Sequence, residues 1–146
     1  MKQHLISRIA IYLLSLVMIF FGIQHFTNPH GLVSRVPDFL PGGITWVYFA
    51  GAAFILAAIS FMTNILVRVA AYLLALMLLI FVVTIHLPQY LDTADKDYRQ
   101  ATMINLLKDL ALAAFALYIA SNARHQKVLE ETSVEEENAK LHELVT

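Results

Sequence analysis

The sequence predicts an all-α membrane protein, a bundle of four transmembrane helices followed by a charged tail. Hydrophobic side chains make up 59% of the 146 residues and charged ones only 14%, whereas soluble domains carry about a quarter charged residues. A helix needs about 20 residues to cross roughly 30 Å of hydrocarbon. None of the candidate runs has the polar face of a helix that lies on a soluble core. Four runs are apolar and long enough, at residues 9–26, 46–62, 65–87 and 102–120.

The first two runs are separated by a segment that cannot be one helix. Lys2 and Arg8 precede the first run as they would in a signal peptide, but no cleavage site of small residues follows, so we interpret it as a retained helix. Residues 27–45 then hold three prolines and three glycines, which break helices. We expect this segment to form a turn-rich cap over one end of the bundle.

The later connections are short. Thr63-Asn64 lies between the second and third runs and predicts a tight helical hairpin. Pro88 is interpreted as the stop signal of the third helix, before a polar connection to the fourth. Small residues recur in the second and fourth runs at spacings that allow close packing, which predicts that these two helices are neighbours. The transmembrane domain is expected over residues 1–121.

The tail, residues 122–146, differs in composition from the rest of the chain. From residue 123 onward it has three Lys or Arg and six Asp or Glu, while residues 1–122 have seven and five. A solvated helix or a disordered end is the favoured interpretation, and no chemistry is assigned to it.

Basic residues predict the orientation, because Lys and Arg accumulate on the cytoplasmic side. The face with both termini and the hairpin has more of them than the opposite face. We therefore expect a multi-pass protein of the cell inner membrane with both termini cytoplasmic. The first face has Lys2, Arg8, Arg68, Arg124 and Lys127, and the second has Arg35, Lys96 and Arg99.

Composition excludes several functions. The chain has no cysteine, which removes thiol nucleophiles, CxxC redox centres and Cys-ligated metals. It has no basic field of the kind that binds nucleic acid. Its histidines show no HExxH or similar spacing, so we expect no metal.

The informative residues are polar ones inside the apolar runs. An Asp or Lys at mid-helix costs about 2.5–3.5 kcal/mol, so such residues normally face the bundle interior and have partners. Alternating crossings bring the ends of the first and third helices and the start of the fourth to one side of the membrane. For Lys108 the competing interpretation is snorkelling to the headgroups, for Asp109 a structural ion pair, and for the histidines a capping or solvated role. The predicted site consists of Lys108, Asp109, His86, His25, Asn105 and Gln24.

The order of these motifs resembles the DoxX-like family of small four-helix membrane proteins, over about residues 8–120. The resemblance implies a small inner-membrane protein, in some relatives associated with quinone-linked oxidation or redox partners and in others with cargo or assembly roles. Many relatives carry a Glu where Phe54 stands here. The matching motifs are Gly22-Ile23-Gln24-His25-Phe26, Val36-Pro37-Asp38-Phe39-Leu40-Pro41, Tyr48-Phe49-Ala50-Gly51, His86 and Asn105-Leu106-Leu107-Lys108-Asp109-Leu110-Ala111-Leu112.

These observations favour a binding or accessory subunit of a quinone-linked redox system, in the lipid bilayer and with a redox protein as partner, rather than an enzyme on its own. Lys108 would bind a quinone oxygen, and His86 or His25 would exchange its proton. The alternatives are a scaffold or assembly factor without catalysis and, less favoured, a small-molecule transporter formed by a homo-oligomer.

Overall fold

The computed structural model describes the backbone of residues 2–145 and the side chains of residues 5–123, and its regular structure is helical. The elements are α1 (Lys2–Thr27), α2 (Pro29–Val33), α3 (Ile44–Thr63), α4 (Val67–Phe81), the π-helical turn η1 (Val82–His86), α5 (Leu87–Asp92) and α6 (Lys96–Val145). The predicted tail lies mostly outside the described side chains. The all-α fold class is confirmed.

Four helical segments are long and apolar enough to cross a membrane, as predicted. Large apolar side chains point outward on all of them; Phe20 and Leu73 are each 61% exposed. Because an exposed apolar surface of this extent suits hydrocarbon rather than water, the chain is a multi-pass membrane protein. The segments are Leu5–Thr27, Ile44–Thr63, Val67–Asp92 and Lys96–Ala123. The third span therefore ends five residues after its predicted end, and the fourth begins six residues before its predicted start.

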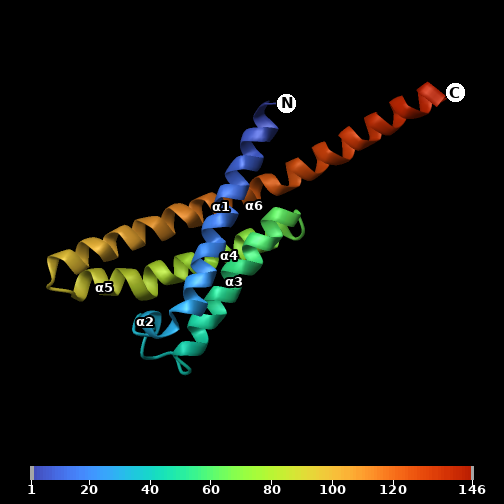
Figure 1. Cartoon of the computed structure of the whole chain (residues 1–146). Coiled ribbons are helices and arrows are strands. Elements are labelled where there is room, and N and C mark those ends of the chain that lie inside the picture. The colour runs from blue at the N-terminus through green and yellow to red at the C-terminus, as the bar shows by residue number, and fades with distance from the viewer. Residues whose placement is uncertain (1, 146) are drawn as a thin grey trace.

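The helices form two antiparallel pairs that cross each other (Figure 1). The helix α1 packs along α3, and the continuous rod of α4, η1 and α5 packs along α6; α3 and α4 join the pairs. The predicted close packing of the second and fourth spans is wrong, because the backbones of α3 and α6 do not approach each other. Instead Ala58 of α3 and Ala116 of α6 contribute to one core from the two pairs, together with Met18 and Leu78.

The first pair is held closely at one crossing of glycines. A Cβ added to Gly22 would lie 2.9 Å from the carbonyl oxygen of Gly51. Small residues at such a crossing let the two backbones touch. The crossing lies one turn from His25, and therefore fixes where that side chain enters the bundle.

The first two connections have the predicted character. The cap between α1 and α3 is confirmed as turn-rich, with the short helix α2 beginning after Asn28, whose side chain accepts a hydrogen bond from the Gly31 amide. The hairpin between α3 and α4 turns at Asn64 and Leu66, whose φ angles are 58° and 54°. The Ser60 hydroxyl donates to the carbonyl of Ile65 within this turn.

The third span does not end at Pro88, which corrects the sequence interpretation. The helix runs on to Asp92 through the wide turn η1, in which the Leu87 amide donates to the carbonyl of Val82, five residues back. Proline has no amide hydrogen, and its ring collides with the carbonyl four residues earlier in an α-helix. For Pro88 that carbonyl belongs to Thr84, inside η1. The wider π turn therefore avoids the collision. Turns of this kind are frequent at functional sites.

Candidate functional site

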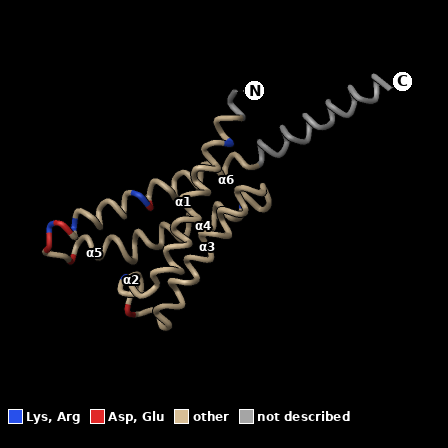
Figure 2. Tube along the Cα trace, viewed as in Figure 1, with Lys and Arg blue, Asp and Glu red and all other residues tan. Residues whose placement is uncertain are grey.

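Two adjacent charges interrupt the apolar stretch of α6. In Figure 2 a blue and a red step stand next to each other midway along that part of the helix, where the sequence has Lys108-Asp109. Asp109 is 5% exposed, so its carboxylate is inside the bundle. The start of α6 at Lys96 puts both residues about 18–20 Å along the helix at 1.5 Å per residue, deeper than the sequence boundary implied.

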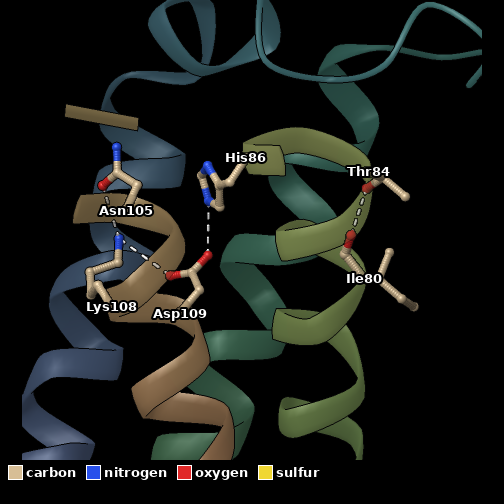
Figure 3. A network of polar contacts seen from close by, with 6 residues as sticks. All are labelled: Ile80, Thr84, His86, Asn105, Lys108 and Asp109. Carbon is tan, nitrogen blue, oxygen red and sulfur yellow. Dashed lines mark hydrogen bonds and ion pairs between the residues drawn. The ribbon is translucent and has the colours of Figure 1, made fainter. Parts of the chain in front are cut away.

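The buried carboxylate is shared by two cationic or polar partners. Nε2 of His86 lies 3.0 Å from Oδ2 of Asp109, and Nζ of Lys108 lies 3.4 Å from Oδ1 (Figure 3). His86 is itself buried and is the last residue of η1. The predicted meeting of the third and fourth helices through His86, Lys108 and Asp109 is therefore present in the structure.

Lys108 is the most accessible member of this cluster. Its side chain is 38% exposed, and its ammonium lies 3.5 Å from the amide oxygen of Asn105, a long hydrogen bond. The ammonium also lies 4.5 Å from the ring centre of Phe21 on α1, in a cation–π contact. The Lys108 side chain thus contacts its partners inside the bundle and remains partly exposed at the surface of the bundle.

The α1 side of the site is built from aromatic rings. Nδ1 of His25 donates to the carbonyl of Phe21 at 2.7 Å, and the imidazole packs on Phe54 with ring centres 5.4 Å apart. Phe54 also packs on Phe21 at 5.8 Å and is only 4% exposed. His25 is near enough to interact electrostatically with Lys108 and Asp109. We call the residues His25, His86, Asn105, Lys108 and Asp109 the polar cluster.

Two polar residues near the ends of the first and third spans are not part of it, and one of them, Gln24, was predicted to be. Gln24 is exposed on α1, and none of the described hydrogen bonds involves its side chain. The Thr84 hydroxyl donates to the carbonyl of Ile80 at 2.7 Å, on its own helix and away from the cluster (Figure 3). The prediction that Gln24 belongs to the site is therefore not supported by its position.

Sequence reasoning missed the roles of Phe21 and Pro88. Phe21 is one of many apolar residues in its span, and only its place one turn before His25 could have indicated it. Pro88 could be recognised in the sequence as a helix breaker. Its effect on where the His86 side chain points could not be predicted, because it depends on the helix continuing past the proline.

The cluster has the chemistry of a small hydrogen-bonding site. It offers an ammonium, a carboxylate and two imidazoles within apolar walls. Among the residues that the structure describes, no three His, Cys, Asp or Glu side chains are grouped so that they could hold a metal ion.

Two shallow grooves lie away from the cluster. One of about 330 Å³ is apolar and lies along α1 beside Met62. The other, of about 320 Å³, lies between α1 and α6 and is lined by residues that include Ser7, Ile11, Phe115 and Asn122. Neither groove is lined by a residue of the polar cluster.

Comparison with known proteins gives one match. A family model described as a domain of unknown function (DUF8561) matches residues 14–123, which include the second half of the first span, the other three spans and the polar cluster. No curated protein and no solved structure matches the chain.

Proposed function

The chain belongs to the DUF8561 family, and we propose that it is a membrane-embedded binding or accessory subunit of a quinone-linked redox system. The polar cluster would hold the head group of a quinone, and the rest of the ligand would remain in the lipid. The observation that carries this proposal is the buried Asp109 carboxylate, which holds His86 and Lys108 together while Lys108 stays 38% exposed.

Burial of the cluster supports a functional role. Polar and ionisable residues within spans are expensive and commonly mark functional sites. The charges of Asp109 and Lys108 compensate each other, and His86 faces the second oxygen of the Asp109 carboxylate. An ammonium has three donors, and two of those of Lys108 face Asp109 and Asn105, so the third would donate to an oxygen of a ligand.

The surroundings of Lys108 support a lipid-soluble ligand. The backbones of α1 and α6 do not approach closely, and Lys108 bridges them by its contact with Phe21. Apolar side chains such as Phe20 and Leu107 are exposed on the same two helices. A ligand that diffuses in the bilayer would reach the ammonium from this side and would find an aromatic wall for its ring.

The proposal extends to location and partners. The bias of Lys and Arg toward the termini and the hairpin supports insertion in the cell inner membrane with both termini cytoplasmic. The cluster would then lie in the outer leaflet, below the α2 cap. The chain has no cysteine, so electrons would come from a redox protein partner. The resemblance to DoxX-like proteins agrees with this assignment.

The test is the quinone content of the purified protein. The chain is extracted in mild detergent and the bound quinone is quantified by mass spectrometry per mole of protein. We expect close to one quinone per chain, and at least a tenfold lower content in Lys108→Met. Lys96→Met, at the exposed start of the same helix, is the matched control and should keep the quinone. A wild type without quinone, or an unchanged content in a folded Lys108→Met, would contradict the proposal.

One observation favours a second function, that of a scaffold or assembly factor. The cluster already satisfies Asp109 internally, and the His86–Asp109 bond joins the π turn to α6. If this is its whole role, Lys108→Met lowers the melting temperature and the yield of a partner complex but leaves the ligand content unaltered.

A further inference from the structure

The hydrogen bonds of His86 determine which of its ring nitrogens carries the proton. A carboxylate only accepts hydrogen bonds, so Nε2, which faces Asp109 at 3.0 Å, must be the protonated nitrogen. The other nitrogen, Nδ1, is buried and has no hydrogen-bond partner among the described residues. In the neutral imidazole this nitrogen is a lone-pair acceptor without a donor.

The unpartnered nitrogen lies on the side of the ring away from the ion pair. Lys108 and Asp109 compensate each other's charge. Figure 3 shows Nδ1 pointing away from Asp109, toward the end of the bundle that α2 covers. A buried acceptor that lacks a partner calls for a ligand or a water that supplies a donor.

The hydrogen bond of His25 likewise determines which of its ring nitrogens carries the proton. A backbone carbonyl also only accepts, so Nδ1 of His25, 2.7 Å from the Phe21 oxygen, carries the proton. Nε2 of His25 is then an acceptor, and none of the described hydrogen bonds involves it. Two helices, α1 and the third span, thus each present an imidazole acceptor in the polar cluster.

We infer that the polar cluster recognises a hydroxyl-bearing head group, of the hydroquinone or phenol class, and prefers it to the oxidised dicarbonyl form. The inference rests on the proposed function and specifies the state of its ligand. The hydroxyl donates to an imidazole nitrogen, His86 Nδ1 in the first place, and Lys108 donates to an oxygen of the same ligand. A quinone has two carbonyl oxygens and no donor, so it can use Lys108 but leaves both imidazoles without partners. A buried polar group that loses its partner rejects an analogue strongly.

The experiment compares three probes that share a decyl chain: a benzohydroquinone, its benzoquinone and its dimethyl ether. Binding to the full chain in lipid nanodiscs is measured without oxygen by equilibrium dialysis, and empty nanodiscs give the correction for partition into lipid. We expect the hydroquinone to bind about tenfold more tightly than the quinone and the dimethyl ether. In His86→Phe the three affinities should become similar, while Thr84→Val, on the same span and outside the cluster, should keep the preference.

The comparison in the wild-type protein does not depend on the folding of any variant. If the three probes bind equally well and Lys108→Met weakens all of them, the preference for a hydroxyl is wrong and the proposed function stands. If the quinone binds most tightly, the inference is also wrong. If no probe binds above the partition into empty nanodiscs, both the inference and the proposed function are contradicted.

Discussion

Gly51 on α3 touches His25 on α1 so closely that a Cβ added to the glycine would lie 2.7 Å from the Cβ of the histidine. Real Cβ atoms do not approach to this distance, and the neighbouring atom is part of the stem of His25 rather than the end of a flexible side chain. The position of one imidazole of the polar cluster therefore depends on the absence of a side chain on another helix.

Gly51→Ala should accordingly destabilise the protein. Alanine is the better helix former by about 1 kcal/mol, but overpacking costs about 1–3 kcal/mol, and here the two backbones must separate. We expect a net loss in the free energy of unfolding, measured by titration with denaturing detergent. Ala114→Val, which adds volume at an exposed position of α6, is the control and should change little. An increase in stability for Gly51→Ala would contradict the packing of α1 on α3.

A double-mutant cycle should detect the bond between His86 and Asp109. Couplings between polar residues of membrane helices average about 0.6 kcal/mol and reach about 1.7 kcal/mol. Because this pair is buried and separated by 23 residues, we expect a coupling in the upper part of that range for His86→Ala with Asp109→Ala. The cycle of Thr84→Val with Asp109→Ala should give a coupling near zero. Equal couplings in the two cycles would mean that the bond does not form.

Pro88→Ala should release the π turn. The alanine amide can donate to the carbonyl of Thr84, which allows a regular α-helix and rotates His86 relative to α6. We expect the nitrogen NMR signals of His86 to lose the fixed tautomer with a protonated Nε2, and the binding of hydroquinone to weaken. Pro37→Ala, in the connection before α3, should leave both unchanged. Retention of the tautomer in Pro88→Ala would show that the proline does not direct the side chain.

A glutamate at position 54 tests the environment of the site and the family resemblance together. Phe54 and Phe61 lie on the same helix and are each 4% exposed, but only Phe54 lies against His25. A glutamate there would lie against the His25 imidazole, whereas at position 61 it would be an unpaired buried charge, which costs several kcal/mol. We expect Phe54→Glu to fold and Phe61→Glu to fail in expression. Similar losses in both variants would contradict this difference.

The absence of cysteine permits a test of the orientation. Single cysteines at the exposed positions Asp38 and Asp95 should react in intact cells with a reagent that does not cross the membrane. A cysteine at Thr63, at the opposite end of α3, should react only after lysis. The reverse pattern would invert the proposed topology.

The spans could be predicted from the sequence because hydropathy and length decide which segments enter lipid. Their ends could not be predicted equally well. Residues 88–101 are polar enough to indicate a connection, but α5 and the first turns of α6 extend through most of it as helices that pack on each other. The pairing of the helices could not be predicted either. Small residues occur both at the contact of α1 with α3 and in the core that the four spans share, so they do not indicate which two helices are neighbours.

The polar cluster was predictable in part for an energetic reason. Lys108, Asp109 and His86 cost so much in an apolar span that they must find partners, and few candidates exist. The tautomers of the histidines could not be predicted, because they depend on the Phe21 carbonyl and on which oxygen of Asp109 faces the ring.

The π turn changes the phase of the third span. Residues of an α-helix follow one another by about 100°, and one additional residue in a turn displaces everything after it by that angle. A helical wheel drawn through residues 67–92 as a single α-helix would therefore put His86 on a wrong side. When related sequences are aligned, a one-residue gap between Val82 and His86 would mark the chains in which this imidazole no longer faces α6.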